Sequence, residues 1–166
     1  MSGGDLADAV RKVVDGNVYM VLGTADRVGR PWVSPVFYAA DAYRDFYWIS
    51  SPEVVHSRNL ATRPEVSIVV FDSKAPVGAG GARAVYMAAT ATEVAEGDVD
   101  RALAVYPGAA ERGGRELDAT ALRPPAPYRL YCASVTDYSV VCPRPAGTPC
   151  AEHGLDYDHR TRVHLP

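Results

Sequence analysis

The sequence predicts a mainly β protein, a small antiparallel β-barrel of about six or seven strands with short helices at its periphery. Three observations support this fold class. The chain has 166 residues, enough for one domain with its own hydrophobic core. Short runs rich in β-branched and aromatic residues are separated by turn residues. Long helices do not alternate with these runs, which argues against a doubly wound parallel sheet.

The N-terminal half is predicted to form one helix and a series of strands. Apolar residues recur at helical spacing over 5–15 (Leu6, Val10, Val13, Val14), which indicates an amphipathic helix. The β-rich runs predict strands at 18–24, 30–40, 46–50 and 65–72, with turns at 25–29 and 41–45.

The C-terminal half is predicted to add more strands, short helices and a tail. The stretch 77–82 (VGAGGA) is expected to be a flexible loop. Further elements are expected at 83–94 (strand), 99–106 (helix), 117–122 (helical turn), and 128–135 with 138–142 (a closing hairpin). From 143 to 166 proline, glycine, cysteine and charge alternate without a period, so this part is expected to be an extended tail of a single domain, 1–166.

The composition excludes several classes of partner and location. The formal net charge is -3 and the pI is about 5.8, so no nucleic acid or anionic membrane surface is expected as a partner. The N-terminus is not a signal peptide, and the longest apolar run is too short to span a bilayer. The three cysteines form no tightly spaced pair, so reduced thiols and a cytoplasmic location are expected.

The stretch WISSPEVVHSRNLATRPEV (48–66) is a candidate anion site. Ser51 is a good N-cap and Pro52 suits a first helical turn, so a helix is expected over 52–61. Backbone N–H groups at a helix N-terminus bind phosphate well. His56 and Asn59 share a helix face, and the long side chain of Arg58 can reach it. A capped, solvated surface helix explains the same residues, so both interpretations stay open.

The strand Trp32–Tyr38 carries a second candidate feature. Pro35 cannot donate to a β-ladder, which predicts an edge strand or a bulge. Free backbone groups beside it could serve the polar rim of a flat heterocycle. A plain edge strand is an equally good interpretation.

Other motifs indicate no catalytic or metal chemistry. Gly78, Gly80 and Gly81 lack the spacing of a phosphate loop or a dinucleotide fingerprint. Cys142, Cys150 and His153 include no CxxC pair, so no metal site is predicted. The chain offers no nucleophile–base motif, so catalytic residues stay unknown and any redox chemistry needs a bound cofactor.

In their order, these segments resemble the FMN-binding split β-barrel family, the proteins similar to pyridoxamine 5'-phosphate oxidase. The likeness rests on VYMVLGT, GRPWVSPVFY, FYWISS and HSRNLATRPEVSIVVFD, and it covers about residues 18–94. The later YRLYCASVTDYSVV is similar to the closing strands of the family.

The resemblance implies a homodimer with two FMN molecules at the subunit interface. It places one strand segment along the isoalloxazine ring, and the next strand end with its helix around the phosphate. Carried onto this chain, the ring residues are Ser34, Pro35 and Val36, and the phosphate residues are Ser50, Ser51, His56, Ser57, Arg58 and Asn59. His56 stands where the family often has lysine. Because histidine loses its positive charge near neutral pH, phosphate binding is expected to weaken as the pH rises. Arg162-Val163-His164 is only faintly similar to the substrate motif of the vitamin oxidase itself.

The sequence thus predicts an FMN-dependent oxidoreductase acting on an unidentified small molecule. One alternative is a flavin- or haem-binding protein without turnover. Another is a deazaflavin-dependent reductase, which the acidic pI disfavours because the anionic tail of that cofactor suits a basic groove.

Overall fold

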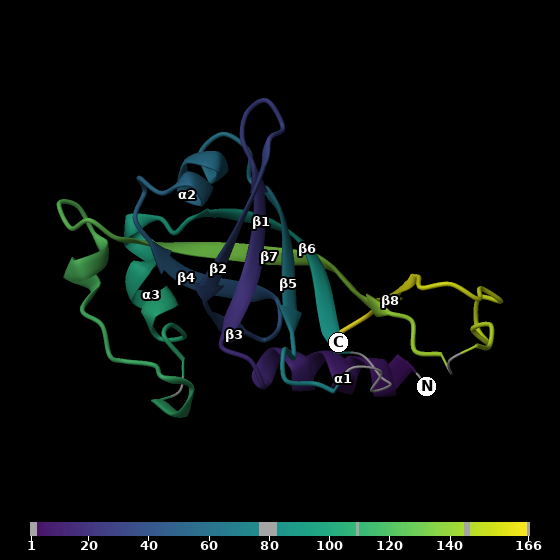
Figure 1. The fold of residues 1–166 in the computed structure, drawn as a ribbon. Coiled ribbons are helices and arrows are strands. Elements are labelled where there is room, and N and C mark those ends of the chain that lie inside the picture. Colours follow the sequence, from purple (N-terminus) through teal and green to yellow (C-terminus); the bar gives the residue numbers. More distant parts are fainter. Residues whose placement is uncertain (1–2, 77–82, 109, 145–146, 166) are drawn as a thin grey trace.

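The computed structural model is an antiparallel β-barrel that carries short helices (Figure 1). It describes residues 3–76, 83–108, 110–144 and 147–165. The strands are β1 (Tyr19–Ala25), β2 (Pro31–Phe37), β3 (Ala39–Asp41), β4 (Asp45–Ser50), β5 (Glu65–Phe71), β6 (Ala84–Glu93), β7 (Arg129–Val141) and β8 (Arg160–Val163). The helices are α1 (Gly3–Asp15), α2 (Val55–Leu60) and α3 (Val99–Leu103), with 3₁₀ turns η1 (Glu96–Asp98), η2 (Ala110–Arg112) and η3 (Ala119–Leu122).

The continuous segment formed by β2 and β3 brings the two ends of the sheet together. The strands follow the order β2-β1-β5-β6-β7-β4-β3, and β8 pairs with β7 off this path. Only Tyr38 separates β2 from β3, and its N–H donates to the carbonyl of Val18 at 3.1 Å. The first half of this segment therefore pairs with β1 and the second half with β4. This closure confirms the predicted split β-barrel.

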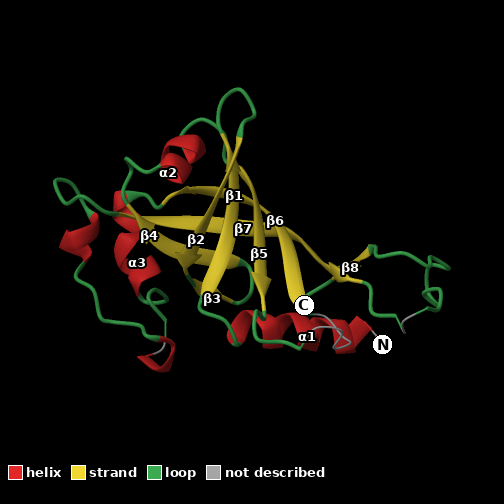
Figure 2. Cartoon of the chain, in the orientation of Figure 1, coloured by secondary structure: helices red, strands yellow, loops and turns green. Residues whose placement is uncertain are grey.

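The core fills the barrel and extends to α1, which lies across one end of it (Figures 1 and 2). Strand residues alternate between buried and exposed, as in the burial of every second residue of β5 and β6. The apolar stripe predicted for the first helix is buried against this end. The largest fully buried side chains are Trp48, Tyr38, Phe46, Met20, Leu22, Ile68 and Leu130.

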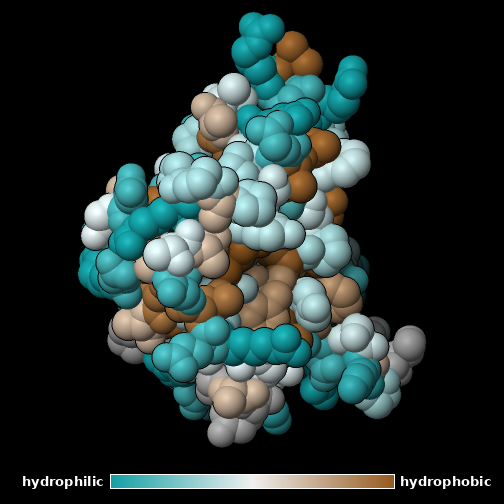
Figure 3. Space-filling model, turned by 90° about the vertical axis from the view of Figure 1, so that its left-hand side faces the viewer, coloured by the Kyte–Doolittle hydropathy of each residue, from teal (hydrophilic) through white to brown (hydrophobic). Residues whose placement is uncertain are grey.

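A smaller apolar cluster joins α3 and η3 to the barrel wall. It is built around Val99, Ala102 and Leu130, with Phe37 and Ile49 packed against it. Figure 3 views this side of the molecule and shows apolar side chains gathered in a shallow hollow.

The helix predicted over 52–61 is shorter than expected. Residues 51–54 form a turn, in which the N–H of Val54 donates to the carbonyl of Ser51 at 3.3 Å. The Ser51 hydroxyl accepts from the N–H of Glu53 at 3.2 Å, so it caps this turn. Helix α2 begins at Val55 and its N-cap, Val54, makes no side-chain hydrogen bond. The Ser51 side chain takes a backbone N–H hydrogen bond that would otherwise be available to a helix, and this favours the turn.

The predicted closing hairpin is one long strand. In β7, Thr136 faces no partner because the register shifts between Ala88 and Ala89 of β6, and its hydroxyl donates to the carbonyl of Ala88 at 3.1 Å. The polar residues that suggested a turn therefore form a β-bulge. The predicted tail also differs, because its residues Arg160–Val163 return to the sheet as β8. The loop predicted at 77–82 lies outside the described residues.

Within the described part of the chain, no helix is long and apolar enough to cross a membrane.

Candidate functional site

Three polar side chains from separate elements converge at one end of the barrel. His56 of α2 lies between two serine hydroxyls: its Nε2 is 2.7 Å from Ser50 Oγ at the end of β4, and its Nδ1 is 3.0 Å from Ser34 Oγ on β2. The indole N–H of Trp32 also donates to Ser34 Oγ, at 3.1 Å. We call Ser34, Ser50 and His56 the serine–histidine cluster. It unites residues predicted for the flavin ring and for the phosphate in a single hydrogen-bonded group.

The electrostatics of this cluster favour a neutral imidazole. His56 is 7% exposed, and burial lowers the pKa of its ring. A neutral ring has one N–H and one lone pair, so one serine accepts from it while the other donates to it. Protonation would make both ring nitrogens donors. Both serine hydroxyl hydrogens would then be free to turn towards an anion.

Arg58 and Ser51, two of the predicted phosphate residues, lie apart from this cluster. The Arg58 guanidinium is exposed and forms an ion pair with Glu53 at 2.8 Å. Ser51 serves the turn that precedes α2. Because α2 has only six residues and begins after this turn, the predicted helix N-terminus at Ser51 is absent. Of the predicted phosphate residues, Ser50 and His56 are the two whose side chains hydrogen-bond to each other.

The other two predicted phosphate residues are buried beneath α2. Asn59 is 5% exposed, and its Nδ2 donates to Thr24 Oγ1 on β1 at 3.0 Å. Ser57 is 4% exposed, and its Oγ has no hydrogen-bond partner among the described residues. It lies close enough to the Tyr131 hydroxyl to oppose the rise in the pKa of Tyr131 that burial causes. Asn59 thus fastens α2 to the barrel.

The strand that is predicted to lie along the ring, β2, is at the edge of the sheet. Within the described sheet β2 pairs only with β1, so it is the edge strand that Pro35 predicts. The side chain of Val36 is buried in the core, whereas Pro35 is exposed. Only Ser34 of the three contributes a side chain to the cluster.

Sequence reasoning missed Trp32 and Thr24. Trp32 is 48% exposed, and it lies on the face of β2 shared by Ser34. It borders a groove of about 740 Å³ between the β1–β2 hairpin and the start of β5, which Thr24 and Arg63 also line. That volume is in the range of small-molecule sites. The sequence signal that points to Trp32 is a tryptophan two residues before Ser34 in a strand that Pro35 marks as an edge strand.

We expect Asn59→Ala to lower stability without a selective effect on an anion. The substitution leaves the buried Thr24 hydroxyl without its donor, which costs about 1–3 kcal/mol in the free energy of unfolding. Chemical denaturation measures this loss, with Arg58→Ala as the exposed control on the same helix. If Asn59 instead binds phosphate, the variant will lose affinity for FMN but not for riboflavin.

One protein family matches most of this chain. The family described as pyridoxamine 5'-phosphate oxidase matches residues 6–142, from α1 to the residue after β7. The chain belongs to the pyridoxamine 5'-phosphate oxidase family. The match includes every residue of the serine–histidine cluster. No curated protein matches the sequence.

Solved structures show the same fold at low sequence identity. A heme binding protein from Mycobacterium smegmatis is 20% identical, with a TM-score of 0.65; the match covers 98% of this chain and 58% of that one. HutZ from Vibrio cholerae, named as a heme storage protein, is 20% identical with a TM-score of 0.57, over 79% of this chain and 90% of that one.

A member of the pyridoxine phosphate oxidase family also shares the fold. The protein, from Clostridium acetobutylicum, is related to general stress protein 26. It is 9% identical with a TM-score of 0.62, and the match covers 98% of this chain and 97% of that one. The pyridoxamine 5'-phosphate oxidase family thus shares its barrel with proteins named for haem.

Proposed function

We propose that this chain binds FMN beside the serine–histidine cluster and acts as a flavin-dependent oxidoreductase on a small molecule. The observation that carries the proposal is the convergence of Ser34, Ser50 and His56 from three elements onto one point. The groove next to Trp32 supplies a concave, partly apolar surface for a flat ring. Membership of the pyridoxamine 5'-phosphate oxidase family supports the choice of a flavin.

In this proposal the cluster holds the phosphate of FMN. A phosphate dianion favours the protonated form of His56, which then donates to both serines. The hydroxyl hydrogens of Ser34 and Ser50 would then be free to donate to the phosphate. The edge of β2 and the Trp32 indole would border the ring. FMN itself would supply the hydride or electron transfer, while the protein binds and orients it.

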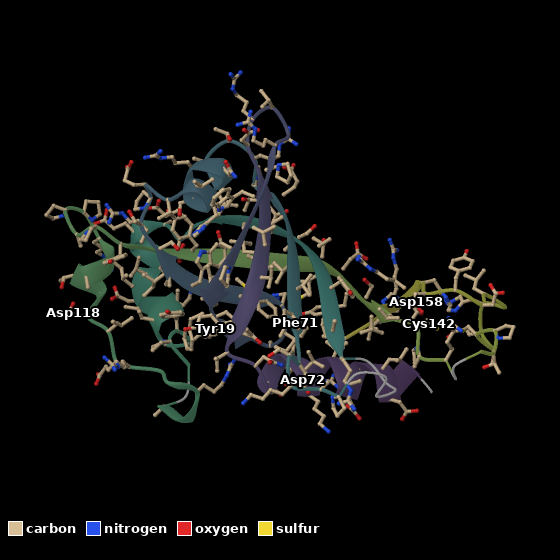
Figure 4. The ribbon with its side chains drawn as sticks, viewed as in Figure 1. Tyr19, Phe71, Asp72, Asp118, Cys142 and Asp158 are labelled. Atoms are coloured by element: carbon tan, nitrogen blue, oxygen red, sulfur yellow. The ribbon has the colours of Figure 1, made fainter. Side chains whose placement is uncertain are left out.

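A homodimer completes the proposal. The outward face of β1 and β2 carries exposed Tyr19 (61%) and Val33 (60%) next to Pro35 (Figure 4 labels Tyr19). An apolar strand face with an unpaired edge is suited to contact with a second copy. Light scattering coupled to gel filtration measures the assembly; a mass equal to one chain over micromolar concentrations would exclude the dimer. A cytoplasmic location, in keeping with free cysteines, belongs to the same proposal.

The visible spectrum of the freshly purified protein tests the cofactor. We expect flavin absorption, and saturable quenching of FMN fluorescence when FMN is added to the flavin-free protein. Oxidation of reduced nicotinamide by the loaded protein then separates an enzyme from a binding protein. A protein that is colourless and does not bind added FMN would contradict the proposal.

Haem is the second candidate. Its support is a buried imidazole whose pKa is lowered by burial, together with the fold shared with two proteins named for haem. A Soret band that shifts in His56→Ala would favour haem over FMN. Absorption and fluorescence typical of a deazaflavin would favour that cofactor instead.

A further inference from the structure

Outside the barrel, the chain makes an excursion between β7 and β8. We call residues 142–159 the C-terminal arm. Cys142 directly follows β7 and His159 directly precedes β8. The N–H of Cys142 donates to the carbonyl of His159 at 2.8 Å, which continues the β7–β8 ladder by one further bond. Figure 4 labels Cys142 and Asp158, the neighbour of His159 in the chain, at the base of the arm.

Four side chains of this arm converge on one point. Cys142 Sγ lies 3.2 Å from Cys150 Sγ. His153 Nδ1 lies 3.7 Å from Cys142 Sγ and 3.4 Å from Cys150 Sγ. His159 Nε2 lies 3.2 Å from His153 Nδ1. All four atoms are within 4.8 Å of one another, and both cysteines are buried and free.

We propose that Cys142, Cys150, His153 and His159 bind a structural Zn²⁺ ion. Zn–S bonds of about 2.3 Å and Zn–N bonds of about 2.0–2.1 Å give a tetrahedron with edges of about 3.3–3.8 Å. The four close distances above run from 3.2 to 3.7 Å, near those edges. Two sulfurs and two imidazole nitrogens form a donor set that favours zinc. Two thiolates would also neutralise its charge.

The surroundings of the two histidines fit this role. His159 Nδ1 lies 3.0 Å from the carbonyl oxygen of Tyr157, which can only accept, so Nδ1 carries the proton. The lone pair of His159 is therefore on Nε2, which faces the other three ligands. His153 turns Nδ1 to the cluster, and its Nε2 lies 3.9 Å from Glu152 Oε1. A hydrogen bond such as that of His159 to the Tyr157 carbonyl orients histidine ligands in metal sites, whereas 3.9 Å is too long for a hydrogen bond between His153 and Glu152.

No metal site is predicted here from the sequence, because Cys142, Cys150 and His153 include no CxxC pair and an extended tail is expected over 143–166. Pairing of β8 with β7 brings His159 next to Cys142. A turn then places His153 beside Cys150, with the N–H of Gly154 donating to the carbonyl of Cys150 at 2.7 Å. Gly154 has φ +67°, which glycine adopts without strain.

The C-terminal arm has almost no hydrophobic core of its own, and a bound metal ion would hold it together instead. Among the described residues 143–144 and 147–158, Cys150 is the only buried one. A chain segment with so little buried apolar surface needs another source of order. Zinc would close the loop between the ends of β7 and β8, and so hold β8 against the barrel. This role is independent of the proposed flavin site at the other end of the molecule.

Metal content of the full-length protein tests the proposal directly. We expect about one zinc per chain by elemental analysis after purification without added metal or chelator. After chelation and gel filtration, Co²⁺ added to the protein should give intense visible bands and a thiolate charge-transfer band at one equivalent. Zn²⁺ should then displace Co²⁺ and bleach both.

Variants locate the metal. Cys150→Ser and His159→Gln are expected to lower zinc content at least fivefold, whereas the matched controls Cys132→Ser and His164→Gln should keep about one zinc per chain. Both controls remove the same residue types outside the cluster. Zinc below about one fifth of an equivalent in the unmodified protein, or full zinc in both cluster variants, would overturn the proposal.

The reactivity of Cys142 and Cys150 in the unmodified protein tests the zinc proposal even if a variant fails to fold. In the unmodified protein, alkylation followed by mass spectrometry should leave Cys142 and Cys150 unlabelled until a chelator is added. Hydrogen exchange in peptides of 142–163 should accelerate on chelation, while exchange in β5 and β6 stays constant. A mass lower by two hydrogens, with Cys142 joined to Cys150 and no zinc present, would show a disulfide instead and refute the proposal.

Discussion

Replacing Trp48 by alanine is expected to lower the free energy of unfolding by about 3–5 kcal/mol. Trp48 is fully buried at the centre of the barrel and stacks on Tyr131, with ring centroids 5.6 Å apart and an interplanar angle of 18°. Truncation removes this stacking and leaves a cavity. Urea denaturation, followed by far-ultraviolet circular dichroism, measures the change.

Trp48→Phe makes this prediction sharper. The Trp48 indole N–H is buried without a hydrogen-bond partner among the described residues. Phenylalanine removes that unpaired donor while keeping a ring against Tyr131, so we expect less than half the loss seen with alanine. Tyr128→Ala, at an aromatic side chain 52% exposed, is the control and should change stability by less than about 0.5 kcal/mol. Equal losses in both Trp48 variants would show that the N–H is satisfied.

Replacing His56 by alanine is expected to weaken FMN binding by about 10- to 100-fold. The variant removes the charged ring that donates to both serine hydroxyls and so frees them to donate to the phosphate; losing such charge-assisted hydrogen bonding costs about 1.5–3 kcal/mol. Riboflavin, which has no phosphate, should bind both proteins equally. Arg58→Ala is the matched control, because that exposed cation is paired with Glu53 and should matter less than threefold.

The pH dependence of FMN binding tests the same group. Burial lowers the pKa of His56 in the free protein, and the bound dianion raises it, so binding takes up a proton. Affinity should therefore fall as pH rises above the pKa of the free ring, and level off above that of the bound ring. His56→Lys keeps a charge to higher pH and should flatten this profile between about pH 6 and 9. A flat profile in the unmodified protein would contradict a role for His56 protonation.

Much of the fold could be predicted because its signals are local. Periodicity identified α1, and β-rich runs between turn residues identified β1, β4, β5 and β6. Local patterns failed where distant segments decide the outcome. Thr136-Asp137 suggests a turn, but pairing with β6 converts it into a bulge within β7. Ser51-Pro52 suggests the start of a helix, but the Ser51 hydroxyl accepts a hydrogen bond from Glu53 and stabilises a separate turn before α2.

The candidate site, too, was predictable only in part from the sequence. The sequence by itself determined the family, the edge character of β2 and the residues around His56 as the polar segment of interest. Only the tertiary structure decided which of them meet: Ser34 and His56 are 22 positions apart, and the barrel closure joins them. Likewise, only the return of β8 brings His159 to Cys142. Contacts between distant residues depend on strand register and closure, which no local pattern encodes.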